Sequence, residues 1–369
     1  MKILLLSDSN SSHTCKWAVS LSKSGHHIKL FSLFDTRKKI IQLYKENNIK
    51  VISPKIKIKT TKLRQPSLVK LKYLKSLPLL LKTIKTFNPD VINAHFASSY
   101  GVLGLLARFK PLVLSVWGSD IIDFPKKNIF NKWIVGRVIK YADEICSTSY
   151  VMKDIIRDDF NRFDINVIPF GVDPNIFKRD KFPKKFTVGT IKSIEKHNGI
   201  DCLLDAAKIV IRENQKKINF LIVGDGSQKK KMEKKTYELG IEKFVEFTGY
   251  IEHEKVLDQY KKLSLFIAVS TMESFGVSVL EAASCKIPSI TSNVGGLTEV
   301  NLHKETGLVI EPNNPQKLAK AILYFLDNES LRIELGNNAR KRIINSFNWE
   351  ESVIQMIKVY KGVSKNYVK

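Results

Sequence analysis

Two glutamates, Glu273 and Glu281, stand eight residues apart on either side of a Phe-Gly step. Ionised carboxylates accept hydrogen bonds from hydroxyl groups, which sugar and ribose rings carry in number. The loop between a strand and the first turn of a helix is where α/β enzymes hold phosphates. The pair therefore predicts a site for a phosphorylated ligand that has several hydroxyls.

The segments around this pair fit such chemistry. A mostly apolar run at 263–269 is typical of a buried parallel strand, and 277–285 is typical of a short helix. We expect the backbone amides of Phe275, Gly276 and Val277 to bind sugar or phosphate oxygens, because the first amides of a helix have no partner inside it. Glycine at position 276 lets the backbone approach a ligand closely. The alternative interpretation is an acidic helix start beside a buried aromatic ring.

Strand-like and helical segments alternate along the whole chain, which favours α/β domains with parallel, doubly wound sheets. A length of 369 residues suits two such domains. The segment 168–174, which holds proline and glycine and precedes a charged stretch, marks the join. Strands are expected near 2–7, 27–32, 50–53, 90–95, 111–117, 144–149, 165–169, 186–191, 218–224, 244–248, 263–270, 288–292 and 307–311.

Composition argues for an ordinary globular protein and against several special classes. No apolar run reaches the ~18 residues that span a bilayer, and Met1-Lys2 leads directly into a strand, so we expect no secretory signal. The four cysteines and seven histidines show no metal-ligand spacing. We therefore expect reduced thiols in a cytosolic protein, and no metal site.

The net charge of +25 is spread unevenly. Residues 1–170 hold 29 Lys and Arg against 12 Asp and Glu, a net +17, and the stretch from Asn47 to Pro89 holds 11 basic residues and no acid. This excess fits either a lysine-rich composition with solvated side chains or a face for anionic lipid headgroups. No nucleic-acid-binding module accompanies it. Pro78 is expected to kink or break a helix in this stretch.

The segment 270–281 continues into 288–300, which holds Gly295-Gly296, and then into 306–312 and 346–349. Together these segments resemble glycosyltransferase family 4, the group 1 retaining enzymes of the GT-B fold. Weaker similarity in 1–33, 88–95 and 166–173 extends the resemblance over nearly the whole chain. It implies an α/β architecture of two doubly wound Rossmann-like domains facing each other across a cleft. We accordingly expect an acceptor-binding domain at 1–169, a nucleotide-sugar-binding domain at 170–346 and a C-terminal helix at 347–369 that returns to the first domain.

In this family the first acid of the motif contacts the hydroxyls of the transferred sugar and the second contacts the nucleotide ribose. The resemblance implies these roles for Glu273 and Glu281. The leaving diphosphate needs positive charge as its bond breaks, and the family supplies an Arg and a Lys after the first strand of the second domain. Here the Arg is absent, and Lys192 and Lys196 are the candidates. The chain has no Asp-x-Asp pair, which favours a reaction without metal or cofactor.

His95 ends a predicted strand at a place where the family often has a histidine close to the reacting sugar. Either its imidazole binds a sugar hydroxyl or it is part of the hydrogen-bonded structure. Gly224, at another strand end, and Tyr250 lie where the family places donor contacts, the second of them at the nucleotide base. Asp120 either meets the acceptor or caps the helix that follows it.

The sequence thus predicts a retaining, metal-independent hexosyltransferase that uses a nucleotide sugar, with a UDP-sugar expected. The acceptor is expected to be a saccharide or a lipid-linked saccharide in the synthesis of a surface polysaccharide or glycolipid such as lipopolysaccharide. A peripheral location at the inner face of the cytoplasmic membrane would explain the excess of basic residues in the first domain. Two alternatives stay open: another GT-B-shaped nucleotide-sugar enzyme, such as an epimerase or a phosphorylase, and a non-enzymatic basic protein that binds nucleic acid or membrane.

Overall fold

The computed structural model describes residues 1–56, 73–214 and 217–367. The chain forms two compact units, of which unit 1 comprises Met1–Ile168 with Val353–Lys369, and unit 2 comprises Pro169–Ser352. Part of the basic stretch between Asn47 and Pro89 falls in 57–72 and therefore lies outside the described residues.

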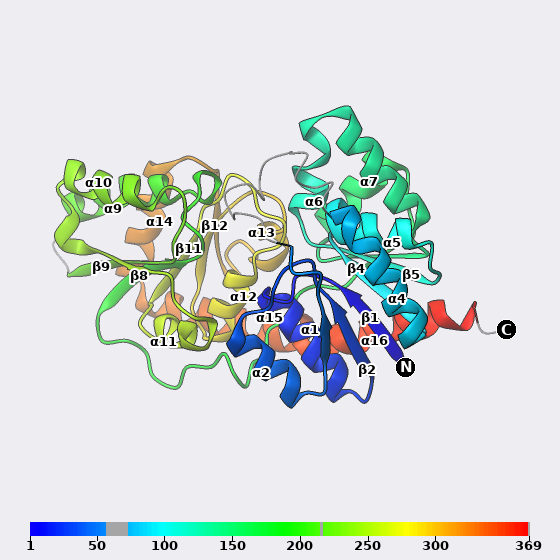
Figure 1. The fold of residues 1–369 in the computed structure, drawn as a ribbon. Helices are drawn as coiled ribbons and strands as arrows, with labels where there is room; N and C mark the ends of the chain where they lie inside the picture. Colours follow the sequence, from blue (N-terminus) through cyan, green and yellow to red (C-terminus); the bar gives the residue numbers. More distant parts are fainter. Residues whose placement is uncertain (57–72, 215–216, 368–369) are drawn as a thin grey trace. The chain divides into compact units, whose positions relative to one another are not determined.

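Unit 1 is built on a seven-stranded parallel sheet with the order β3-β2-β1-β4-β5-β6-β7 (Figure 1). The chain runs outward from β1 to β3, and then returns to the other side of β1 to form β4, so β1 and β4 are neighbours at the point where the strand order reverses. The strands are β1 Lys2–Leu6, β2 His27–Phe31, β3 Lys50–Ile52, β4 Val91–His95, β5 Leu112–Val116, β6 Glu144–Ser147 and β7 Ile165–Val167.

Helices cover both faces of this sheet (Figure 1). They are α1 Ser12–Lys23, α2 Lys38–Glu46, α4 Leu77–Phe87, the π-helical turn η2 Phe96–Tyr100, α5 Gly101–Ala107, α6 Ser119–Ile122, the 3-10 turn η3 Pro125–Lys127, α7 Ile129–Tyr141 and α8 Tyr150–Phe160. The expectation that Pro78 kinks or breaks a helix is wrong, because Pro78 is the second residue of α4. The first turn of a helix tolerates proline, since the missing N–H has no intrahelical partner there.

Unit 2 is built on a six-stranded parallel sheet with the order β10-β9-β8-β11-β12-β13. Its strands are β8 Phe186–Ile191, β9 Ile218–Val223, β10 Val245–Gly249, β11 Leu265–Ala268, β12 Ser289–Ser292 and β13 Gly307–Ile310. Its helices are η4 Lys196–Asn198, α9 Ile200–Glu213, α10 Lys229–Leu239, η5 Glu242–Phe244, η6 His253–Lys255, α11 Val256–Tyr260, α12 Val277–Ser284, α13 Leu297–Val300, α14 Pro315–Asp327 and α15 Glu329–Ser346.

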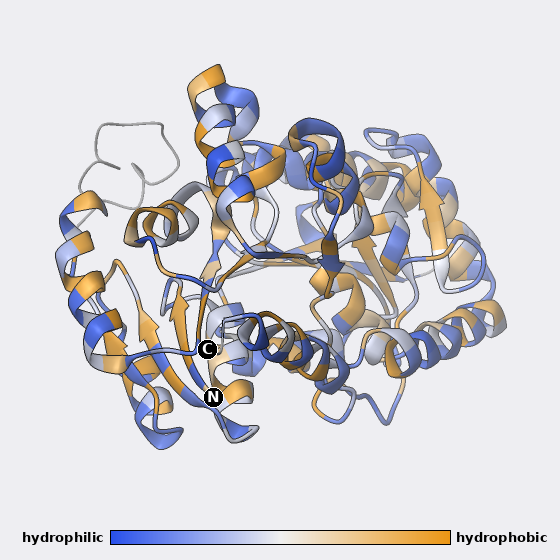
Figure 2. Cartoon of the chain, turned by 90° about the vertical axis from the view of Figure 1, so that its right-hand side faces the viewer, coloured by the Kyte–Doolittle hydropathy of each residue, from blue (hydrophilic) through white to orange (hydrophobic). Residues whose placement is uncertain are grey.

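The strands form where the sequence has short apolar runs rich in Val, Ile and Leu, and both sheets lie inside their units. Val91–His95 and Leu112–Val116 are buried at every position, as expected for parallel strands covered on both faces. Figure 2 shows the strands mostly in the hydrophobic colour, whereas the helices alternate between hydrophobic and hydrophilic. Each predicted strand is present, and the prediction of two parallel α/β domains is confirmed.

The last helix, α16 Trp349–Lys365, packs on the sheet of unit 1 through the residues from Val353 onward. Its inward residues Val353, Met356, Tyr360 and Val363 are all at most 6% exposed and recur every three or four positions, as one face of a helix requires. The Tyr360 hydroxyl lies 3.0 Å from Asn93 Oδ1 on β4. Among the described residues, no helix combines the length and apolar character that crossing a membrane requires.

Candidate functional site

The strand order of unit 2 reverses between β8 and β11, which are hydrogen-bonded neighbours although β9 and β10 lie between them in the sequence. In open parallel sheets, ligands bind outside the carboxyl ends of the strands at such a switch point. The loops that follow these two strands, 192–199 and 269–276, therefore define the candidate site. Both loops carry residues that the sequence had singled out.

Lys192, from the loop after β8, reaches the loop after β11. Its Nζ donates to Glu273 Oε2 at 3.0 Å and to Ser270 Oγ at 2.6 Å. The Lys192 side chain is 10% exposed and that of Glu273 is 23% exposed, so the pair is partly shielded from water. The structure thus brings together one of the two candidate lysines and the acid predicted to meet the sugar.

Lys196, the other candidate lysine, is exposed in the short turn η4. This turn is held by the Asn198 amide, whose Nδ2 donates to the carbonyl oxygen of Ser193 at 2.6 Å. The two loops are also joined directly, because the amide of Thr271 donates to the carbonyl oxygen of His197 at 2.8 Å. Lys196 therefore belongs to the same loop as Lys192 but has its side chain in solvent.

Gly295 and Gly296, in the turn after β12, contact the backbone of Glu273. Gly295 has a φ of +48°, and a Cβ placed there would lie 1.9 Å from the carbonyl oxygen of Glu273. The amide of Gly296 donates to that same carbonyl at 3.2 Å. Only a residue without a side chain permits this approach, so the glycine pair fixes the position of the acid.

Helix α12 begins directly after Gly276, which has a φ of +109°. The preceding Phe275 is 2% exposed, and its ring packs at 6.4 Å from Phe170 and 6.0 Å from Phe347. The aromatic ring therefore anchors the loop in the core of unit 2. The predicted amide donors at Phe275, Gly276 and Val277 lie at the start of the helix, where amides lack intrahelical partners.

Glu281 lies one turn inside α12, and its Oε2 accepts a hydrogen bond of 2.8 Å from the Tyr260 hydroxyl. Burial, together with the nearby Glu281 carboxylate, raises the pKa of Tyr260 well above its ordinary value, so the hydroxyl keeps its proton and donates. Tyr260 thereby orients the carboxylate predicted to meet the ribose. The sequence offered no signal for this residue, since it is 21 positions from its partner.

Gly224 follows β9, and its backbone packs against the backbone of Lys192 in the loop after β8. A Cβ there would lie 2.0 Å from the carbonyl oxygen of Lys192, and the Gly224 amide donates to the carbonyl oxygen of Gly249 at 3.0 Å. Tyr250 follows β10, the edge strand, and is 66% exposed. The structure therefore places Gly224 against the Lys192 loop and leaves Tyr250 two strands away from β8.

In unit 1, His95 is 1% exposed at the end of β4 and uses both ring nitrogens. Nδ1 lies 2.8 Å from Ser7 Oγ, and Nε2 lies 2.9 Å from Asn93 Oδ1. The Asn93 amide nitrogen donates to the carbonyl oxygen of Val113 at 3.1 Å, so Asn93 Oδ1 is the acceptor for His95. The hydrogen on a neutral ring therefore sits on Nε2, and Nδ1 accepts from Ser7.

Burial lowers the pKa of His95 to about 3, with a smaller contribution from nearby His13, so the ring is neutral at physiological pH. The Trp117 ring closes over it at a centroid distance of 4.2 Å. A direct hydrogen bond from His95 to a sugar would require giving up Ser7 or Asn93. Of the two interpretations open from the sequence, this geometry favours hydrogen-bonded structure.

Asp120 is also buried, and it connects two loops of unit 1. Its Oδ2 accepts from the amide of Ala97 at 2.8 Å and its Oδ1 from the amide of Gly118 at 3.0 Å. Burial raises the pKa of Asp120, and these backbone N–H groups oppose the shift. The carboxylate therefore holds the turn after β4 against the turn after β5.

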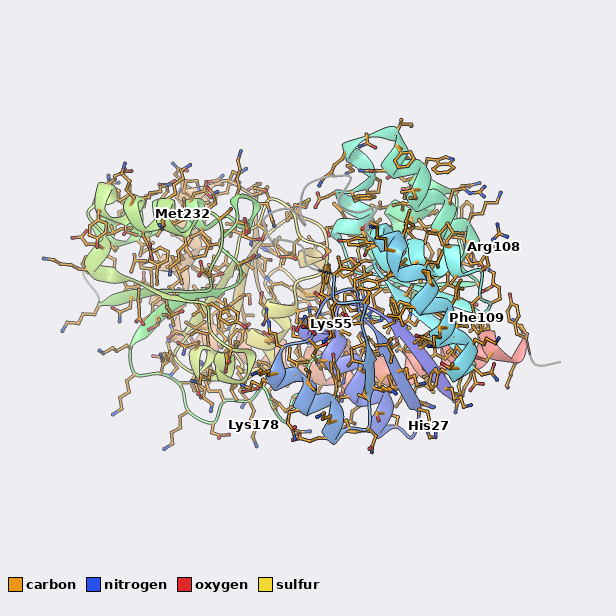
Figure 3. All side chains as sticks on the ribbon, viewed as in Figure 1. His27, Lys55, Arg108, Phe109, Lys178 and Met232 are labelled. Atoms are coloured by element: carbon orange, nitrogen blue, oxygen red, sulfur yellow. The ribbon has the colours of Figure 1, made fainter. Side chains whose placement is uncertain are left out.

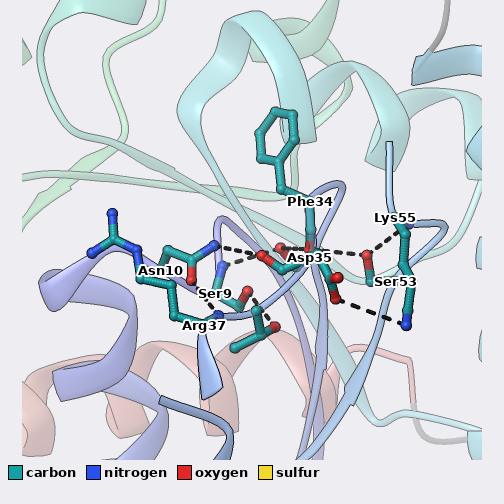
Figure 4. A network of polar contacts seen from close by, with 9 residues as sticks. Ser9, Asn10, Phe34, Asp35, Arg37, Ser53 and Lys55 are labelled. Atoms are coloured by element: carbon teal, nitrogen blue, oxygen red, sulfur yellow. Dashed lines mark hydrogen bonds and ion pairs between the residues drawn. The ribbon is translucent and has the colours of Figure 1, made fainter. Parts of the chain in front are cut away.

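The loop after β1 is fixed by polar side chains (Figure 4). The Asn10 side-chain Nδ2 donates to the carbonyl oxygen of Asp35 at 2.9 Å, and Asn10 Oδ1 accepts from the backbone amide of Arg37 at 2.9 Å. Ser53 Oγ donates to the carbonyl oxygen of Phe34 at 2.9 Å. These contacts hold the loops after β1, β2 and β3 together at the carboxyl edge of the unit 1 sheet.

Within the ranges that the structure describes, no three His, Cys, Asp or Glu side chains gather as a metal-ligand set. The polar groups gathered in unit 2 are a cation, two carboxylates and the first amides of helix α12. These groups suit a ligand that combines a diphosphate with hydroxyl-bearing rings.

Comparison with known proteins gives a consistent family. The family described as glycosyl transferases group 1 matches residues 172–342, and the family described as glycosyl transferase 4-like matches residues 2–149. An uncharacterized glycosyltransferase of Methanocaldococcus jannaschii is 30% identical over 279 residues, which are 74% of this chain and 76% of that protein. O-antigen chain mannosyltransferase C of Escherichia coli is 26% identical over 304 residues, 77% of this chain and 80% of that protein.

The fold is also similar to a solved structure. The crystal structure of Anabaena HepE in complex with UDP-glucose matches with a TM-score of 0.80, covering 98% of this chain and 100% of that chain at 20% identity. Its strands and helices therefore follow the same course as those described above.

Proposed function

The chain belongs to the group 1 glycosyltransferases of the GT-B fold, and from this premise we propose that it transfers a glycosyl group from a nucleotide sugar to a saccharide-containing acceptor. The observation that carries the proposal is the contact between Lys192 and Glu273 at the switch point of unit 2. It puts a cation that can hold a diphosphate beside a carboxylate that can hold sugar hydroxyls. A nucleotide sugar carries these two groups next to each other, at the bond that breaks.

The other predicted site residues of unit 2 bind the ribose, the phosphate or sugar oxygens, and the base of the donor. Glu281, oriented by Tyr260, takes the ribose hydroxyls. The amides at the start of α12 take phosphate or sugar oxygens, and Tyr250 takes the base. A UDP-sugar is the donor to test first, because the similar protein HepE was solved with UDP-glucose.

The proposed reaction retains the anomeric configuration and uses no metal or other cofactor. The bond from the sugar C1 to the diphosphate breaks, and its electron pair goes to the phosphate oxygen. The acceptor oxygen bonds to C1 on the same face, and its proton passes to the leaving phosphate. Lys192 stabilises the charge that develops on that phosphate, with Lys196 as the second cation that can approach it. Glu273 is held by Lys192 and serves to bind sugar hydroxyls.

The acceptor that we propose is a saccharide or lipid-linked saccharide used in surface polysaccharide or glycolipid synthesis. Two observations support it. The chain is similar to an O-antigen chain mannosyltransferase, and residues 1–170 carry a net +17, which suits the anionic inner face of the cytoplasmic membrane.

Calorimetric titration with UDP, GDP and their sugars tests the donor, since a bound donor also raises thermal stability. We expect UDP and one UDP-sugar to bind, and chelation of divalent metal to leave the affinity and turnover unchanged. NMR of the product should show the anomeric configuration of the donor. Binding of no nucleotide sugar would contradict the proposal, and an inverted product would contradict its stereochemistry.

A further inference from the structure

Helix α7 of unit 1 has two apolar faces, of which one is buried in the core and the other is exposed. Val135, Val138 and Ile139 lie on the first face and are at most 1% exposed. The second face carries Phe130 and Trp133, which are 63% and 59% exposed. A surface helix ordinarily presents polar residues on the side away from the core, so this second face marks an interaction surface.

The second face of α7 lines a cavity of about 1050 Å³, together with α5. This volume is slightly above the ~300–1,000 Å³ typical of sites for small ligands. Most of the lining side chains are apolar, and we call this cavity the α5–α7 groove. Its apolar walls are formed mainly by Val102, Leu105, Leu106, Phe130, Trp133 and Ile134.

The rim of the α5–α7 groove is basic. Arg108, at the end of α5, and Arg137, on α7, both line it and are both exposed. Figure 3 labels Arg108. The segment 124–141, which contains α7, has five Lys and Arg and no acid. Of these five, Arg137 lines the groove, and Lys132 is paired with Asp159 at 2.7 Å. Arg108 and Arg137 therefore place positive charge at the rim, next to an apolar interior.

We propose that the α5–α7 groove is a membrane-docking site, in which the acyl chain of an anionic lipid enters the groove and its phosphate binds Arg108 and Arg137. An apolar interior with a cationic rim is complementary to an amphiphile of that charge. Trp133 at the mouth suits the interface between headgroups and acyl chains, where tryptophan is enriched. A second copy of this chain would bring the same cations to the rim, which disfavours self-association there.

This inference deepens the proposed use of a lipid-linked acceptor and rests on it for its biological purpose. Lipid binding itself is measured without donor or acceptor. Nucleotide affinity is measured without membrane, so failure of one proposal is distinguishable from failure of the other.

The test uses tryptophan fluorescence of the full chain. Trp133 is the exposed tryptophan, since Trp17, Trp117 and Trp349 are at most 9% exposed. The protein is mixed with vesicles of equimolar phosphatidylcholine and phosphatidylglycerol, with or without bromine on the acyl chains. Bromine quenches a ring that lies among the chains, so we expect brominated vesicles to quench the emission in low salt and much less in high salt. Trp133→Phe should still float with vesicles while the quenching disappears.

Paired substitutions test which residues contact the vesicles. Ile129→Ser with Phe130→Ser should weaken vesicle binding at least about tenfold, the change that burial of one large apolar side chain produces. Tyr237→Ser with Ile176→Ser in unit 2, at positions 71% and 58% exposed, is the matched control and should change little. Arg108→Gln with Arg137→Gln should remove the preference for phosphatidylglycerol, whereas Lys230→Gln with Lys231→Gln on α10 should keep it.

Three results would overturn the inference. The first is flotation with vesicles while Trp133 stays unquenched, which would place membrane contact elsewhere. The second is burial of Trp133 that depends on protein concentration and not on lipid, which would make the groove an interface between copies of the chain. The third is absence of binding to anionic vesicles in low salt.

Discussion

Replacement of Lys192 by methionine tests the diphosphate role of the cluster after β8 and β11. The substitution keeps most of the side-chain volume and removes the charge that lies 3.0 Å from Glu273 Oε2. We expect the affinity for UDP to fall about 10- to 100-fold, since a charge-assisted contact is lost and Glu273 becomes an unpaired anion facing a diphosphate. Turnover should fall further, by about 10²–10³, because the leaving group gains charge as its bond breaks.

The structure also sets the size of the coupling between the two residues. Across 3.0 Å, Coulomb's law with an effective dielectric constant of about 20 gives roughly 5.5 kcal/mol as an upper bound. Water reaches the pair, since the Glu273 side chain is 23% exposed, and this weakens the attraction. Both charges are also fully solvated in the unfolded state, so the cost of removing that water on folding offsets part of the Coulomb energy. A double-mutant cycle of Lys192→Met and Glu273→Gln should therefore show a coupling of about 1–3 kcal/mol in the free energy of unfolding.

The assays are calorimetry with UDP, release of UDP from a UDP-sugar and chemical denaturation. Lys192→Arg, which keeps the charge, should retain more UDP affinity than Lys192→Met. Exposed Lys230→Met on α10 is the matched control and should behave as the parent chain does. If Lys192→Met binds UDP as tightly as the parent and Lys196→Met does not, the diphosphate is held by Lys196 and the reasoning from the Lys192–Glu273 contact fails.

Three further predictions follow from the buried contacts. His95 has a folded pKa of about 3, below its unfolded value of ~6.5, so the unfolded state binds the extra proton and stability falls as the pH drops through that window. At pH 5 this amounts to about 2 kcal/mol, and denaturation across pH should show the loss in the parent and in exposed His27→Gln but not in His95→Gln. Tyr260→Phe should weaken UDP binding about 3- to 10-fold by calorimetry, because Glu281 loses its hydrogen bond; unchanged affinity would refute its orienting role. Gly295→Ala should lower stability by about 2 kcal/mol or more and abolish donor turnover, since its Cβ meets the Glu273 carbonyl, whereas Gly240→Ala, with a φ of +69° and open space, should cost less.

The course of the fold was predictable because parallel strands are continuous apolar runs, and these are visible locally. The acids Glu273 and Glu281 were recognisable for a similar reason, since the loop and helix that carry them form one short segment. Pro78 was misjudged because its effect depends on whether it falls in the first turn of a helix or inside it.

The partners of these residues were not predictable. Lys192 is 81 positions from Glu273, and Tyr260 is 21 positions from Glu281, so each contact depends on which strands become neighbours in the sheet. The enclosure of His95 depends in the same way on Ser7, 88 positions away and directly after β1, the other strand of the switch point in unit 1. No spacing rule in a single sequence reports such pairs.

The most direct test of the central claim is the turnover and UDP affinity of Glu273→Gln, measured on the same folded protein. Hydrolysis of the preferred UDP-sugar to UDP and free sugar reports turnover without any knowledge of the acceptor. We expect turnover to fall about 100-fold or more, while affinity for UDP, which lacks the sugar that Glu273 holds, changes less than about threefold. Turnover close to that of the parent chain would contradict the assignment of the site in unit 2.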